Sequence, residues 1–128
     1  MHGGVAWTTT LILLGVLAFG AAGPAGAQDA AAGKAVFTSQ CAICHSVQSG
    51  RNMIGPSLFG VVGRKSGSVA GFHYSAANTN AGIVWDEATL GTFLKSPMTV
   101  IPGTTMGYAG LPDDTKRVAV VAYLATLK

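Results

Sequence analysis

The two cysteines of the chain, Cys41 and Cys44, lie three residues apart, and His45 follows them directly. A redox disulfide, half of a zinc site and a covalent haem attachment all use this spacing. A purely structural disulfide is a poor interpretation, because closing so short a loop removes little entropy from the unfolded chain. The segments around the motif have to distinguish among the three kinds of site.

The surroundings of the cysteines favour haem attachment. A thioredoxin-like site would begin a helix in a βαβ setting, whereas here the cysteines follow a predicted helix. A structural zinc site needs four ligands, and the only further histidine after residue 27 is His73, which we interpret as an exposed side chain. In a c-type haem site both thiols add to the haem vinyl groups, and the adjacent imidazole is carried under the iron. We therefore expect one covalently bound haem c.

The first 27 residues are typical of a signal peptide. Residues 11–22 form an unbroken run of apolar residues and glycine, and "AGA" at 25–27 matches a small-residue cleavage site. The first ten residues carry no Lys or Arg, so the positive region is weak. The alternative is an uncleaved anchor, but the run is shorter than the roughly 20 apolar residues that span a membrane. We expect cleavage of residues 1–27, leaving one domain of residues 28–128.

The pattern of apolar residues and caps predicts an all-α domain. A first helix should start after Asp29 as N-cap and end near Cys41, and a short helix should cover 76–80. A third helix should run from its cap Asp86 to the residues before Pro97, with 98–112 as loop. The last helix follows Asp113 and has two apolar stripes, which predicts that it is largely buried. The centre, residues 49–82, has seven glycines and no period. A large apolar cofactor would organise it.

The charged residues support neither nucleic-acid binding nor catalysis. All eight basic and all five acidic residues follow residue 27, so the net charge of +3 belongs to the expected domain. No basic cluster is interleaved with aromatic residues, so we expect no binding to nucleic acid. No nucleophile–base pair or carboxylate pair indicates an enzyme.

The segments "GKAVFTSQCAICH", "GPSLFGVVGRKSG", "GFHYSAANTNAGIVW", "LKSP", "IPGTTMGYAG" and "VVAYL" occur in an order and spacing that resemble the class I c-type cytochromes. This family comprises mitochondrial cytochrome c and its bacterial periplasmic counterparts, and the resemblance covers residues 29–128. It implies a small all-α fold in which the N- and C-terminal helices cross and loops wrap around one covalent haem. Gly33 and Phe37 would pack on Val120 and Tyr123 at that crossing.

The resemblance also implies a set of haem-binding residues. Cys41 and Cys44 would form thioethers, and His45 and Met106 would be the axial ligands of the iron. Met106 also stands out by its setting, after a stiff Pro–Gly turn that can present a thioether from a loop. The carbonyl of Pro56 would accept the other ring N–H of the histidine. The remaining residues would surround a haem propionate: Arg64, Tyr74, Asn78 and Trp85.

The function implied by the resemblance is single-electron transfer. The protein would be a soluble, monomeric, periplasmic carrier that docks transiently, at its haem edge, on a membrane reductase and on an oxidase or photosynthetic reaction centre. Met98, Thr99 and Thr105 stand where lysines often ring that edge, which predicts weak dependence of docking on salt. The alternative function is a small c-type haem enzyme or sensor, a peroxidase or gas binder, with Met106 displaced.

Overall fold

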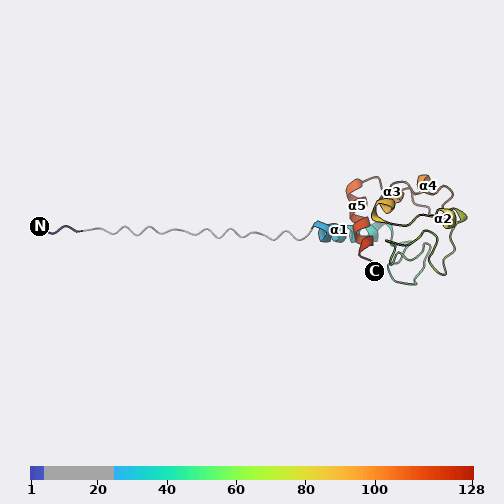
Figure 1. Cartoon of the computed structure of the whole chain (residues 1–128), viewed down its shortest axis with the longest axis horizontal. Helices are drawn as coiled ribbons and strands as arrows, with labels where there is room; N and C mark the ends of the chain where they lie inside the picture. The colour runs from blue at the N-terminus through green and yellow to red at the C-terminus, as the bar shows by residue number, and fades with distance from the viewer. Residues whose placement is uncertain (5–24) are drawn as a thin grey trace.

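The computed structural model describes residues 1–4 and 25–128. Within them the helices are α1 (Ala25–Gln40), α2 (Ala76–Asn80), α3 (Glu87–Lys95), α4 (Pro97–Val100) and α5 (Asp114–Ala125). This described part has no strand, only an isolated antiparallel bridge between Lys65 and Val84. The prediction of an all-α domain is confirmed (Figure 1). Most of the expected leader lies outside the described residues.

The first helix begins earlier than the sequence suggested. It starts at Ala25, so Asp29 lies inside the helix, and the prediction that Asp29 is its N-cap is wrong. Alanine is the strongest helix former, and the alanine-rich stretch on both sides of Asp29 contains no proline that would stop the helix there. The helix ends at Gln40, as expected, so Cys41 is the first residue after it.

The cap of α3 is the one that the sequence predicted, and α5 begins after Asp113 as expected. The Asp86 carboxylate accepts a 2.7 Å hydrogen bond from the Thr89 amide, and the Thr89 hydroxyl accepts a 2.8 Å bond from the Asp86 amide. Asp113 accepts a 3.0 Å bond from the amide of Lys116 at the start of α5. The helix α4 was predicted as loop. It begins at Pro97, whose fixed φ suits a first helical turn.

The crossing of α1 and α5 closes the fold (Figure 1). Gly33 is buried there, and a side-chain carbon added to it would lie 2.5 Å from the carbonyl carbon of Ala119. The rings of Phe37 and Tyr123 pack with centroids 5.6 Å apart, and Val120 is only 1% exposed. Helix α5 is less buried than predicted, because Val118, which belongs to one of its two apolar stripes, is 60% exposed.

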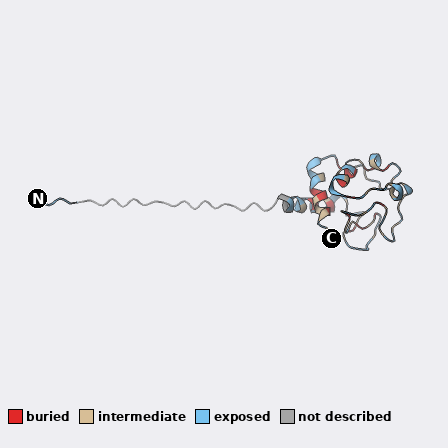
Figure 2. Ribbon diagram, viewed as in Figure 1, coloured by how far each residue is buried: buried red, intermediate tan, exposed pale blue. Residues whose placement is uncertain are grey.

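The buried residues of Figure 2 lie mainly where α3 and α5 meet the loops. The irregular centre is tied to this core by backbone hydrogen bonds, with Gly60 N–H donating to the carbonyl of Leu127 and Gly63 N–H to that of Trp85. These ties hold the loops at a distance that leaves a pocket between them and the helices. None of the helices in the described ranges has the length and hydropathy that crossing a membrane requires.

Candidate functional site

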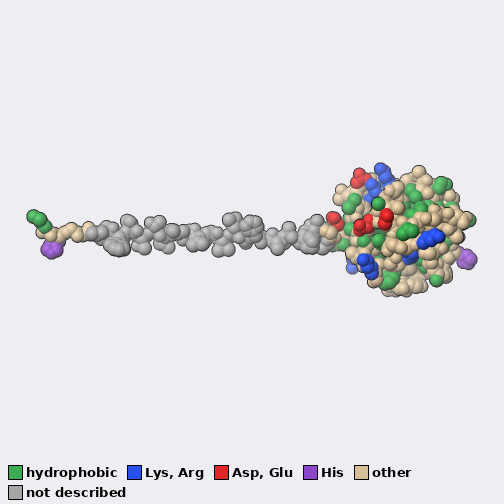
Figure 3. Space-filling model, viewed as in Figure 1, with side chains coloured by type: hydrophobic (Ala, Val, Ile, Leu, Met, Phe, Trp, Pro, Cys, Tyr) green, Lys and Arg blue, Asp and Glu red, His purple; other side chains and the backbone are tan. Residues whose placement is uncertain are grey.

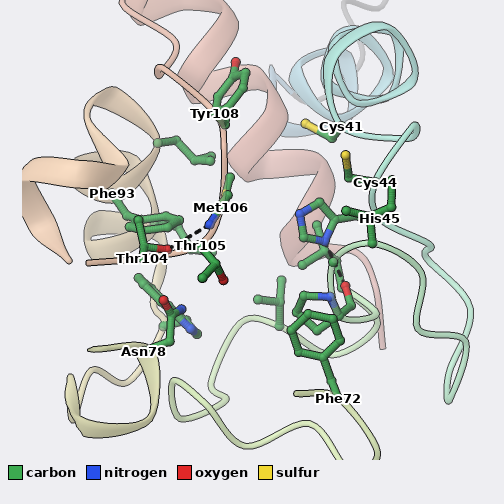
Figure 4. A pocket seen from close by; sticks show the side chains of 18 of the residues that line it. Cys41, Cys44, His45, Phe72, Asn78, Phe93, Thr104, Thr105, Met106 and Tyr108 are labelled. Carbon is green, nitrogen blue, oxygen red and sulfur yellow. Dashed lines mark hydrogen bonds between the residues drawn. The ribbon is translucent and has the colours of Figure 1, made fainter. Parts of the chain in front are cut away.

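A pocket of about 440 Å³ lies between the helices and the loops (Figure 4). Its floor is apolar and comes from elements far apart in the sequence: Leu58, Val61, Leu90, Phe93, Leu94, Val120 and Leu124. Its volume is in the range of pockets that bury a small molecule or cofactor. All the residues that the sequence predicted for the site line it: Cys41, Cys44, His45, Pro56, Arg64, Tyr74, Asn78, Trp85 and Met106.

The cysteine motif forms one wall of this pocket. The turn after α1 is fixed by two hydrogen bonds to the carbonyl of Cys41, from the amides of Cys44 and His45 at 3.1 and 2.9 Å. Both thiols are free and half-buried, and both face the pocket. Burial raises the pKa of the Cys41 thiol, and the neighbouring Cys44 raises it further. The wall therefore presents two thiols toward an apolar space.

The imidazole of His45 has one ring nitrogen occupied and one available. Its Nδ1 lies 2.8 Å from the carbonyl oxygen of Pro56. Because a carbonyl only accepts, Nδ1 carries the proton and donates it. Burial lowers the pKa of His45, the bond to Pro56 opposes this effect, and the charge of Arg64 adds to it. The ring is therefore held as a neutral tautomer whose Nε2 has a lone pair for a metal.

Gly55 lets that ring lie directly against the backbone. A side-chain carbon added to Gly55 would lie 2.6 Å from Nδ1 and 2.8 Å from Nε2 of His45, so only glycine fits behind it. The amide of Gly55 donates to the carbonyl of Cys44 at 2.8 Å, which holds the glycine against the cysteine turn. This role was not predicted from the sequence. The adjacent glycine and proline of "GPSLF" were the available signal.

Met106 comes from the opposite side of the pocket, on the loop after α4 (Figure 4). Its amide donates a 3.2 Å hydrogen bond to the hydroxyl oxygen of Thr104. Farther along the same loop, Gly110 (φ +117°) passes so close to Lys95 that a side-chain carbon on it would lie 3.0 Å from that residue's carbonyl carbon. A soft thioether thus shares the pocket with the available nitrogen of His45.

The polar residues predicted for a propionate gather at one end of the same pocket. Tyr74 accepts a 3.2 Å hydrogen bond from the amide of Val69, so its hydroxyl keeps its proton for a further acceptor. Arg64 donates to the carbonyl of Phe59 at 3.0 Å, and burial lowers the pKa of its guanidinium, while Tyr74 opposes that effect. These donors suit an anionic group within an otherwise apolar pocket.

Two further predicted residues also line the pocket. The carboxamide oxygen of Asn78 accepts a 3.1 Å hydrogen bond from the Ser75 hydroxyl, at the start of α2. Trp85 is 7% exposed, and its ring packs on Phe93 with centroids 4.9 Å apart. Gly67 (φ +70°) was not predicted. A side-chain carbon on it would lie 2.7 Å from Cα of Thr79, so the glycine lets the loop approach α2.

The donor set of the pocket fits haem c. Two thiols stand beside an imidazole with a free nitrogen, a thioether lies across the pocket, the floor is apolar, and proton donors gather at one end. The zinc alternative gains no support, because among the described residues no group of three or more His, Cys, Asp or Glu side chains is placed to hold a metal ion. His73 is exposed, as expected, and does not line the pocket.

Comparisons with known proteins agree with this geometry. The family model for cytochrome c matches residues 30–128. Cytochrome c2 of Rhodopila globiformis is 49% identical over 100 residues, which cover 78% of this chain and 94% of the relative. Cytochrome c2 iso-2 of Magnetospirillum molischianum is 53% identical over 90 residues, 69% of this chain and 91% of the relative.

A solved structure of a cytochrome has a similar fold. Cytochrome cH from Methylobacterium extorquens superimposes with a TM-score of 0.71 at 40% sequence identity, covering 77% of this chain and 98% of its own. The resemblance inferred from the sequence segments is confirmed. The chain belongs to the cytochrome c family.

Proposed function

We propose that this chain is an electron carrier that holds one haem c through Cys41 and Cys44, with His45 and Met106 as axial ligands. The observation that carries the proposal is the pocket itself, which has the thiols and the free imidazole nitrogen on one side and the thioether on the other. When bound, the haem supplies an iron that changes by one electron between its ferrous and ferric states.

Residues of the chain would hold that iron in surroundings that do not change with its oxidation state. The bond from His45 to Pro56 orients the ring and raises its basicity, as such bonds do at most metal-bound histidines. The apolar floor excludes water, and Arg64 and Tyr74 offer donors for a propionate. Two fixed axial ligands of this kind favour transfer of an electron over binding of a substrate, so we propose no enzymatic activity.

The mass and visible spectrum of the protein from its native host test this proposal. We expect a mass increased by one haem, a reversible one-electron reduction, and the weak far-red band that methionine ligation gives to the ferric form. An open iron site would lack this band, which would favour the haem enzyme or sensor. No feature of the pocket favours that alternative over Met106 ligation.

The mouth of the pocket supports transient docking with little help from charge. Every exposed residue of the lining is uncharged: Gln40, Ile43, Ile54, Thr105 and Gly107. Met98 nearby along the chain is 60% exposed. Figure 3 shows acidic and basic side chains interspersed over the visible face, with no dense patch of one sign. Electrostatic steering needs such a patch, so docking should rest mainly on apolar contact.

The partners we propose are a membrane reductase and an oxidase or photosynthetic reaction centre, met by a monomer in the periplasm after removal of residues 1–27. The leader-like sequence supports the location, and the relatives named cytochrome c2 support the class of partner. The association rate with a native oxidase or reductase should change little across a salt series. A fall of several decades would refute apolar docking.

A further inference from the structure

The segment that carries Met106, residues 105–110, has few ties to the rest of the molecule. Its ends are fixed, because Ile101 before it is 2% exposed and the amide of Leu111 after it donates to the carbonyl of Leu94 at 2.7 Å. Between these ends, the described residues make two hydrogen bonds with the segment 105–110. One is the local bond from the Met106 amide to Thr104. The other joins residues 68 positions apart.

That second bond runs from the Tyr108 hydroxyl to the side-chain oxygen of Gln40, at 2.6 Å. Gln40 is the last residue of α1 and precedes Cys41 directly. In the described part of the chain, it is the only hydrogen bond that joins the segment 105–110 to the cysteine wall of the pocket. Figure 4 shows Tyr108 and Met106 on one loop, with Cys41 on the facing side.

We propose that the Tyr108–Gln40 bond is a clasp that holds Met106 in the pocket and limits access of external ligands to the iron. The inference rests on the proposed function, in which Met106 is an axial ligand. Tyr108 is a positioning residue, because it acts through the backbone two residues from Met106. Its ring is half-buried and lines the pocket, so a phenylalanine would keep the packing and lose only the bond.

The clasp sets how often the segment opens. An exposed neutral hydrogen bond contributes a factor of about two to ten to such an equilibrium. A ligand that binds only the open form has an apparent affinity proportional to the open fraction. Imidazole is a suitable probe, because it is a small neutral ligand that binds ferric haem iron when the methionine leaves.

The experiment measures imidazole binding to the haem-loaded ferric protein by the loss of the far-red band. Tyr108→Phe and Gln40→Met should each raise the apparent affinity about two- to tenfold. The double variant should show no further increase, because both changes remove one bond. Gln40→Glu keeps an acceptor and should remain within about twofold of wild type. Tyr123→Phe, which removes a hydroxyl at the α1–α5 crossing, is the matched control and should have no effect.

The possible results distinguish a failure of the clasp from a failure of Met106 ligation. Suppose that the far-red band shows Met106 still bound. Equal imidazole affinities for wild type and Tyr108→Phe would then overturn the clasp, and so would additive effects in the double variant. A rise in affinity in Tyr123→Phe as large as that in Tyr108→Phe would also overturn it, because the effect would then be general loosening. A wild-type ferric protein without the band would refute Met106 ligation, and the clasp with it.

Discussion

Replacing Gly33 by alanine should destabilise the protein although the position is helical. Inside a helix, alanine is favoured over glycine by about 1 kcal/mol. Here the added carbon would lie 2.5 Å from the carbonyl carbon of Ala119 and 2.8 Å from Cβ of Tyr123, where ordinary contact begins at 3.4 Å. The first of these atoms is backbone and cannot rotate away, and the carbonyl oxygen of Ala119 is nearer still, so α1 and α5 would have to separate by about an ångström or more.

The steric effect should exceed the gain in propensity. Overpacking of this kind costs about 1–3 kcal/mol and occasionally more, and the separation also displaces Val120 from the pocket floor. We expect a net loss of about 1–2 kcal/mol, which lowers the melting temperature of a domain of this size by roughly 4–16 °C. Thermal unfolding of the haem-loaded protein measures it.

The matched control is Gly91→Ala in α3. That glycine is also helical, but a side-chain carbon on it would meet nothing within 4 Å. We expect the control to raise the free energy of unfolding by up to about 1 kcal/mol. The reasoning is refuted if Gly33→Ala is as stable as wild type, or if the two alanine variants shift the melting temperature in the same direction.

Three further predictions concern the pocket and a helix cap. Gly55→Ala should displace the imidazole of His45 and shift the reduction potential, and a voltammogram identical to that of wild type would show that the ring has room. Replacing both Cys41 and Cys44 by alanine should leave a largely disordered chain when it is made without haem, because the pocket walls would then face an empty space. Far-UV circular dichroism that shows full helix content and cooperative unfolding would contradict this. Hydrogen bonds from Thr89 keep the pKa of Asp86 below its ordinary value, so its contribution to stability is present above that value and is lost as the pH falls below about 4. The difference in melting temperature between wild type and Asp86→Asn should narrow over that acid range, and a constant difference would count against it.

Local chemistry made much of the fold predictable. Asp86 and Asp113 mark the starts of α3 and α5 because their side chains satisfy amides within the next turn, which is a short-range effect. Asp29 misled the prediction, because a capping residue inside an alanine-rich stretch is simply carried within the helix. The four-residue helix α4 has no periodic pattern to detect and depends on its buried Pro97.

The site was predictable where a motif has fixed spacing and unpredictable where contacts join distant segments. The cysteines and His45 share one turn, so their pattern is visible in the sequence. Nothing near Gln40 indicates that it meets Tyr108, because that contact depends on how the loop folds back. The role of Gly55 likewise follows from the ring that packs against it, and the adjacent Pro56 marks only a turn.

The α1–α5 crossing joins the two ends of the domain, and this has a consequence for the order of assembly. The close contact of Gly33 with Ala119 spans most of the chain, so it is a non-local contact that forms only after the last dozen residues have been synthesised. The cysteine motif, by contrast, follows α1 directly and is complete early. During synthesis the thiols and His45 are therefore exposed before the carboxyl-terminal helix can cover them.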